Sequence, residues 1–188
     1  MTSAREPARP APDQYALPLL LAVLGGCAVA LALGLYAKLH HPTGFSLDIA
    51  GFSSALYAKA WLTTAAAVFA VVQLVTASRM GRPGAAAWIG PVHRWSGRIA
   101  ILLTVPVIVH CIFALGFQTY SVRVLVHSVL GCFFYGAFVA KMLSLGIIRR
   151  GPRPGWLIPV LGGMVFLSLI ALWATSALWL FTTKGVHS

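Results

Sequence analysis

The chain alternates between long apolar segments and short polar links that contain most of its basic residues. The apolar segments cover about residues 15–39, 58–78, 93–117, 122–145 and 156–181. Each is close to or above the roughly 20 residues that an α-helix needs to cross the hydrocarbon core of a bilayer. The links contain proline and glycine, which end helices. The pattern therefore predicts an all-α fold, an integral membrane bundle of five transmembrane helices.

The two ends of the chain differ from its body. Residues 1–14 are rich in proline and alanine and show no apolar period, so a disordered tail is expected there. The first apolar segment is too long for the core of a signal peptide and lacks a small-residue cleavage site, so it is expected to stay as a helix. We expect one transmembrane domain over residues 15–182 and a C-terminal tail over residues 183–188.

Composition and charge exclude several classes of protein. Only 9% of the residues are charged and 59% are hydrophobic, whereas soluble domains carry roughly 25% charged residues. Lysine and arginine outnumber acids by 14 to 3, but they lie in the links and form no stripe along one helix. A nucleic-acid-binding surface is therefore not expected. The expected environment is a lipid bilayer.

The distribution of cations predicts the orientation. One side of a five-helix bundle would hold ten cations: Arg5, Arg9, Arg79, Arg82, Arg94, Arg98, Lys141, Arg149, Arg150 and Arg153. The other side would hold four: Lys38, Lys59, Arg123 and Lys184. Cytoplasmic loops carry the excess of lysine and arginine. This predicts a multi-pass protein of the bacterial cytoplasmic (inner) membrane, with the N-terminus in the cytoplasm and the C-terminus outside.

Three histidines stand in apolar sequence, in the motifs HRWSG, HCIFA and HSVLG. They and the small residues four positions later are His93 and Gly97, His110 and Ala114, and His127 and Gly131. On a helix, positions i and i+4 lie on one face, so each imidazole has a hollow one turn along. A flat ligand could approach the backbone there. The residue types therefore suggest a haem site.

The third and fourth helices place His110 and His127 at equal distances from the turn near Gln118 and Thr119. Both would lie roughly 8–10 Å inside the outer end of the bundle. Polar side chains at such depth usually mark function, although each imidazole could instead hydrogen-bond a neighbouring helix. Packed helices lie about 8–10 Å apart, which is narrow for a haem. The pair therefore requires helices that are splayed or not adjacent, and His40 or His41 is a rival ligand.

Basic residues near the predicted cytoplasmic side suggest further contacts. Lys141 lies fourteen residues after His127 and returns to nearly the same face of its helix, at the depth of His93. Lys141 could simply extend to the headgroups. Alternatively, Lys141, Arg94 and Arg98 could pair with a haem propionate or a quinone oxygen. A second haem between His93 and Lys141 is a further alternative.

Two of these motifs resemble known haem-binding families. PVHRWSGRIAILLTVPVIVH, residues 91–110, is similar to the haem-carrying helix of ferric-reductase-type membrane domains. VHSVLG resembles the HS-x-x-G motif of cytochrome b561 proteins, in which the histidine is an axial haem ligand. The resemblance covers about residues 88–146 and implies haem ligation by His127 first, His110 next and His93 last. It implies one haem b per chain, with a second as the alternative.

These observations predict a b-type cytochrome that transfers electrons between a quinol or a partner redox subunit and an acceptor. They leave open whether it acts as the electron-transfer subunit of a membrane oxidoreductase. The chain contains no G-x-G-x-x-G, no C-x-x-C-H and no iron–sulfur cysteine set, so electrons must come from elsewhere. The three cysteines are read as small buried hydrophobes. The alternative is a haem-free scaffold or assembly subunit, with helices that meet at Gly25, Gly34, Gly131, Gly136 and Gly162. A transporter is less favoured, because no internal repeat and no buried acids occur.

Overall fold

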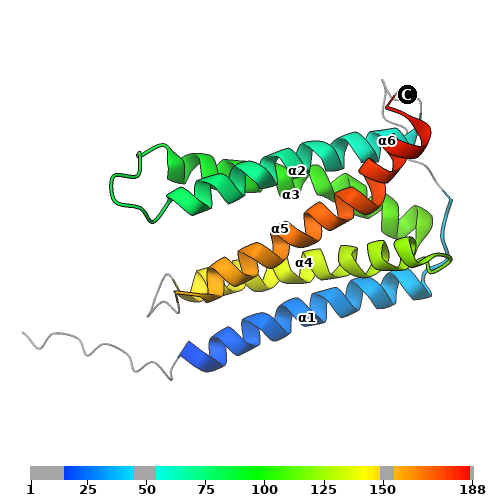
Figure 1. Cartoon of the computed structure of the whole chain (residues 1–188). Helices are drawn as coiled ribbons and strands as arrows, with labels where there is room; N and C mark the ends of the chain where they lie inside the picture. Colours follow the sequence, from blue (N-terminus) through cyan, green and yellow to red (C-terminus); the bar gives the residue numbers. More distant parts are fainter. Residues whose placement is uncertain (1–14, 45–53, 149–154, 187–188) are drawn as a thin grey trace, which may run out of the picture.

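The computed structural model describes residues 15–44, 54–148 and 155–186, and within them the fold is all-α (Figure 1). The elements are α1 (Ala16–Leu39), α2 (Ala55–Arg79), α3 (Ile89–His110), the π-helix η2 (Cys111–Leu115), α4 (Val122–Ile148), α5 (Leu157–Trp173), the π-helix η3 (Ala174–Leu178) and α6 (Trp179–Lys184). Since η2 continues α3, and η3 and α6 continue α5, they make five helices long and apolar enough to span a membrane. The predicted fold class is confirmed.

The ends of the helices differ from the sequence-based expectation by a few residues. The second helix begins at Ala55 instead of residue 58, and the last one extends to Lys184, past the expected end of the domain at residue 182. The predicted tail over residues 1–14 lies outside the described residues.

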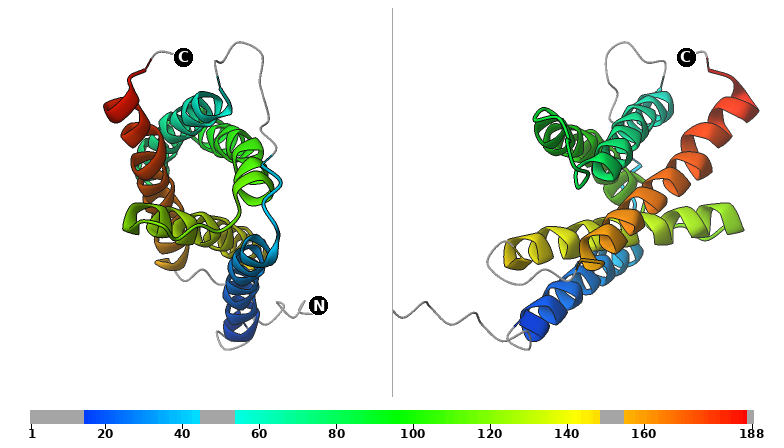
Figure 2. Two further views of the ribbon diagram at one scale, coloured as in Figure 1. Left: turned by 90° about the vertical axis from the view of Figure 1, so that its right-hand side faces the viewer. Right: turned by 60° about the vertical axis from the view of Figure 1, so that its left-hand side comes forward.

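Four helices form a ring, seen end-on in the left panel of Figure 2. Along the ring α3 packs on α2, α2 contacts α5, and α5 packs on α4; α1 packs outside the ring against α4. By contrast the backbones of α3 and α4, although consecutive in the chain, hardly approach each other among the described residues, and a hydrogen bond from the Tyr135 hydroxyl to Thr104 Oγ1 at 2.9 Å bridges the gap. The two histidine-bearing helices are therefore splayed, as a haem between them would require.

The seam between α1 and α4 is built from small residues. Gly26 and Ala30 of α1 face Gly136 and Ala140 of α4, so that a Cβ on Gly136 would lie 2.6 Å from the Gly26 carbonyl oxygen and 2.8 Å from the Ala30 Cβ. The two backbones are in direct contact. Small residues four apart allow this close approach between helices in a membrane.

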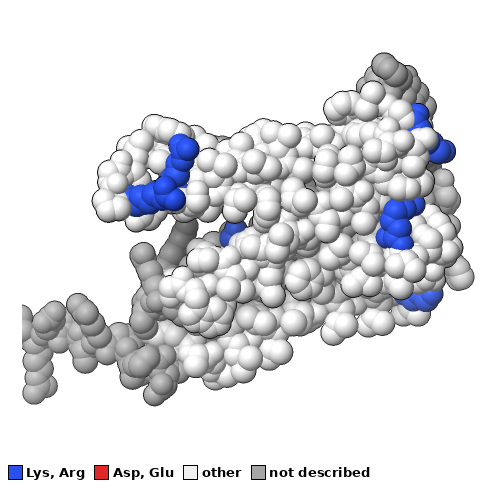
Figure 3. Space-filling view, in the orientation of Figure 1, with Lys and Arg blue, Asp and Glu red and all other residues white. Residues whose placement is uncertain are grey.

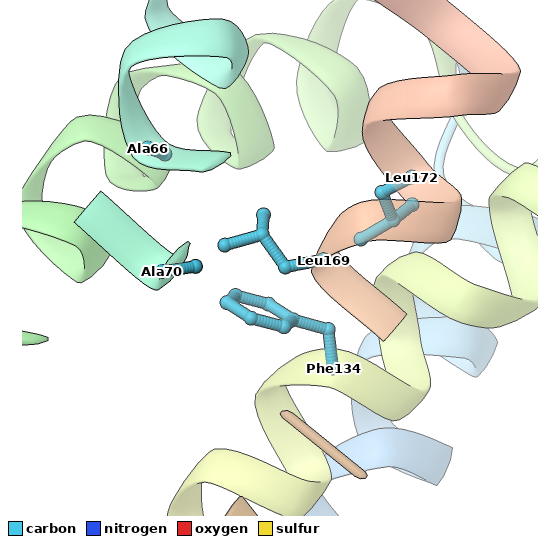
Figure 4. Close-up of a cluster of buried hydrophobic side chains, with 5 residues drawn as sticks. All are labelled: Ala66, Ala70, Phe134, Leu169 and Leu172. Atoms are coloured by element: carbon cyan, nitrogen blue, oxygen red, sulfur yellow. The ribbon is translucent and has the colours of Figure 1, made fainter. Parts of the chain in front are cut away.

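A cluster of buried side chains fills the ring midway along its length (Figure 4). Phe134 of α4 is 1% exposed and lies with Leu169 and Leu172 of α5 against Ala66 and Ala70 of α2. Large side chains from one pair of helices thus meet small ones from the facing helix.

The outer surface suits a lipid environment. Lysine and arginine on the face shown in Figure 3 gather mainly toward the two ends, and the surface between them is almost free of charged side chains. Apolar side chains such as Leu31 and Leu102, both 67% exposed, cover the sides of the helices. A bilayer would bury these side chains. The protein is therefore a multi-pass membrane protein.

Candidate functional site

A half-open cavity of about 620 Å³ lies in the bundle, between the Phe134 cluster and the α3–α4 connection, and the exposed Tyr120 of that connection lines it. All five spanning helices contribute to its wall, and most lining side chains are apolar. The part contributed by α1 comes from Leu33 and Ala37. Cofactor pockets are typically about 300–1,000 Å³ and mostly apolar, with a few polar groups. The size and lining of this cavity fit that description.

One face of each histidine-bearing helix lines the cavity. On the α4 side these residues are Arg123, Val124, His127, Ser128, Gly131, Cys132, Phe134 and Tyr135. On the α3 and η2 side they are Thr104, Val107, Ile108, Cys111, Ile112 and Leu115. Both sets follow the three- and four-residue spacing of a single helical face. Each of these two walls of the cavity is therefore a single helical face.

Both π-helices border the cavity. Residues of η2 and η3, among them Cys111 and Thr175, line it. Pro106, one turn before η2, cannot donate the helical hydrogen bond to Leu102. In η3 the Thr175 carbonyl accepts a hydrogen bond from Arg123 Nη1 at 2.6 Å. Single π-turns inside α-helices often occur at functional sites.

His127 is oriented by a residue of the last helix. Its Nδ1 lies 2.9 Å from Thr175 Oγ1, while the Thr175 hydroxyl donates to the carbonyls of Ala171 at 2.8 Å and Leu172 at 3.2 Å. Since that hydroxyl has one proton, its oxygen accepts the proton on His127 Nδ1. Nε2 then carries the free lone pair. This is the arrangement by which proteins orient a metal-binding histidine.

Gly131 lies one turn along α4 from His127 and also lines the cavity. A Cβ added to Gly131 would meet no atom within 4 Å. The hollow expected beside His127 is therefore present and open. Of the three histidine motifs, HSVLG is the one that presents both its imidazole and its glycine to the cavity.

His110 lies at the end of α3 and is 7% exposed, but it is not among the residues that line the cavity. Its neighbour Cys111 lines the wall instead. Ala114, the small residue one turn later, is also buried, and its carbonyl accepts a hydrogen bond from the Gly44 amide. The structure therefore does not bring His110 and His127 together around the cavity.

His93 lies near the opposite end of the bundle, where side chains of α2 form hydrogen bonds with it. Its Nδ1 lies 2.9 Å from Thr76 Oγ1, and the Gln73 side chain donates to the His93 carbonyl and to the Ser96 hydroxyl. A Cβ on Gly97 would lie 3.0 Å from the Gln73 amide nitrogen. The hollow predicted beside His93 is thus filled by a side chain of α2.

The other predicted contact residues lie away from the cavity. Arg94 and Arg98 are exposed, and the Arg98 guanidinium lies 5.0 Å from the centre of the Trp95 ring. Lys141 is half-buried, and its Nζ would lie 3.8 Å from a Cβ on Gly162. The structure places none of these three cations in the cavity wall.

Among the loop histidines, the His40 ring stacks on Tyr36 with centroids 5.2 Å apart and contacts Phe113 edge-on, whereas His41 is exposed. Neither lines the cavity. The described residues contain no group of three or more His, Cys, Asp or Glu side chains that could hold a metal ion.

Among the polar residues of the cavity wall that were not predicted from the sequence, three lie close to His127 or carry charge: Thr175, Arg123 and Lys59. Nothing in the sequence pattern pointed to Thr175, because 48 positions separate it from His127 in the chain. Arg123 precedes His127 by one turn, so helical spacing alone could have placed both on one face. Lys59 was assigned to the same end of the bundle but given no role; it lines the cavity together with Arg123.

The comparisons with known proteins give a family but no activity. No curated protein and no solved structure matches the chain. The model of the family of unknown function DUF6529 matches residues 19–188, nearly the whole chain, and the protein therefore belongs to this family.

Proposed function

We propose that the protein is a small b-type cytochrome of the membrane, with a haem b in the cavity and His127 as an axial ligand. The observation that carries the proposal is the geometry of His127: its Nδ1 is bonded to Thr175, its Nε2 is free, and it lines a largely apolar cavity beside the open Gly131. The resemblance of VHSVLG to the cytochrome b561 motif supports the same residue.

The chain would supply ligation and an apolar shell that limits access of water. A bound haem b would supply one-electron redox chemistry, with a potential tuned by axial ligands, burial and hydrogen bonds around the site. Thr175 would hold the His127 ring in one orientation. Ligation by His110 as well would require its side chain to turn toward the cavity.

Electrons would pass between a membrane quinol or a redox partner and an acceptor. With the orientation predicted from the cations, the cavity lies in the outer half of the cytoplasmic membrane, since it adjoins the α3–α4 connection. An acceptor at the outer surface is the simplest arrangement. His93, Arg94 and Arg98 do not line this cavity, so a second haem or a quinone beside them would need a separate binding site.

A dithionite-reduced minus oxidised visible spectrum of the detergent-purified protein tests the proposal. We expect sharp α and Soret bands and about one haem per chain, since one cavity contains a suitable histidine. Two haems per chain would bring His93 and Lys141 into question as ligands. A colourless protein, after expression with ample haem, would contradict the proposal and favour the scaffold alternative.

Replacing Thr175 by valine tests the support of His127. The variant keeps the shape of the side chain and removes the acceptor for Nδ1–H, and loss of such a partner typically costs about 10–100-fold in metal affinity. We therefore expect haem affinity to fall by that range in a titration followed at the Soret band. Thr76→Val is the matched control, because Thr76 makes the same contact with His93. Equal losses in both variants would contradict the assignment.

A further inference from the structure

Two cations line the same apolar cavity as His127. Arg123 enters from α4 and Lys59 from α2. Two other lysines near this end of the bundle, Lys38 and Lys184, are exposed and do not line it. Of the four cations that the structure describes at this end of the bundle, only Lys59 and Arg123 therefore contribute positive charge to the cavity wall.

Arg123 is held rigidly in place. Its Nη1 donates to the Thr175 carbonyl at 2.6 Å, and its guanidinium lies 3.8 Å from the centre of the Trp179 ring. A guanidinium has five N–H donors in a fixed fork. One donor serves the backbone of η3, which leaves others for a ligand in the cavity.

Lys59, unlike Arg123, has no partner among the described residues that holds its charged group. Within residues 15–44, 54–148 and 155–186, its ammonium makes no hydrogen bond or ion pair, and it is half-buried. The three acids of the chain, Glu6, Asp13 and Asp48, all lie outside these residues. Lys59 lines a mostly apolar cavity, and an ammonium in apolar surroundings is costly unless an anion pairs with it. The cavity wall therefore offers positive charge to a ligand.

We propose that Lys59 and Arg123 form an anion subsite that binds the carboxylates of a largely apolar ligand. This inference rests on the proposed function, in which the ligand is haem b and the carboxylates are its two propionates. The subsite replaces the propionate partners expected from the sequence, Arg94, Arg98 and Lys141. It also orients the ligand, because the carboxylate edge must face the two cations while the rest of the ring lies toward the Phe134 cluster.

Titration of the haem-free, full-length protein in detergent with haem and with haem dimethyl ester tests the subsite. The ester carries the same ring and iron but no carboxylates. We expect the wild-type protein to bind haem at least about tenfold more tightly than the ester, the size of a single charge-assisted hydrogen bond. Lys59→Gln should remove about tenfold from haem affinity and leave ester affinity unchanged. Lys38→Gln, the matched control, should change neither.

Equal affinity of the wild-type protein for haem and ester would overturn the subsite and leave the proposed function standing. This comparison needs no variant, so it holds even if Lys59→Gln fails to fold. Equal weakening of haem and ester by Lys59→Gln would also overturn it, because the lysine would then act only on structure. Failure of the wild-type protein to bind either porphyrin would overturn the proposed function and, with it, the subsite.

Discussion

Replacing His127 by alanine should abolish retention of haem by the purified protein while the helical bundle stays intact. In the proposed site the imidazole would supply the axial bond to iron, and no other histidine lines the cavity among the described residues. Alanine leaves Gly131 and the apolar wall unchanged, so the protein should still be extracted and migrate as the wild type does. Haem per chain, measured by the pyridine haemochrome spectrum, should fall to near zero.

Two further histidine variants test whether the loss of haem is specific to His127. His41→Ala is the control, because His41 is exposed and away from the cavity, and it should keep full haem content. His110→Ala tests the second predicted ligand. Retention of haem with an unchanged low-spin spectrum would exclude His110 as a ligand, and a change to a high-spin spectrum would identify it as one. A His127→Ala protein with full haem content would contradict the assignment of His127.

The membrane spans could be predicted from the sequence because a bilayer imposes both a length and an apolar composition on each helix. The ends of the helices could not, because local hydrogen bonds decide them. Thr182 and Thr183, expected near or beyond the end of the last helix, donate their hydroxyls to the carbonyls of Leu178 and Trp179. Since both polar groups are satisfied within the helix, α6 extends to Lys184.

The site was predicted in part. His127 gave a clear signal, because an imidazole in an apolar helix needs a partner. Its depth was predicted to match that of His110, but depth says nothing about direction around the helix axis. The cavity face of α3 passes through Val107 and Cys111, and His110 is about 100° away from Cys111. A histidine pair at matched depth can therefore still face different neighbours.

The glycines that follow His93 and His127 also show that spacing in the sequence does not reveal what packs against a helix. Gly97 and Gly131 have identical spacing from their histidines, yet Gln73 of α2 fills the first hollow and the second opens into the cavity. Which helix packs against each glycine decides the difference. That packing depends on contacts between segments far apart in the sequence, so spacing within one motif could not reveal it.

Replacing Gly136 by leucine should detach α1 from the bundle. A side chain at this position would collide with the Gly26 carbonyl and the Ala30 Cβ, and overpacking of this kind typically costs about 1–3 kcal/mol, occasionally more. Because two backbones are in contact there, neither can yield by a rotamer change. The thermal midpoint in detergent should fall. Haem content should fall as well, since α1 contributes Leu33 and Ala37 to the cavity wall.

A disulfide can report directly whether α1 is docked. A Cβ on Gly34 would lie 3.7 Å from Cys132 Sγ, so Gly34→Cys should oxidise with Cys132 in a chain whose other two cysteines are replaced by alanine. Gly136→Leu should abolish this bond. The matched control is Gly146→Leu on the same helix, because Gly146 is exposed and a Cβ there meets nothing within 4 Å. If the disulfide forms equally in both leucine variants, the small-residue seam does not hold α1 in place. Other contacts would then have to keep Leu33 and Ala37 in the cavity wall.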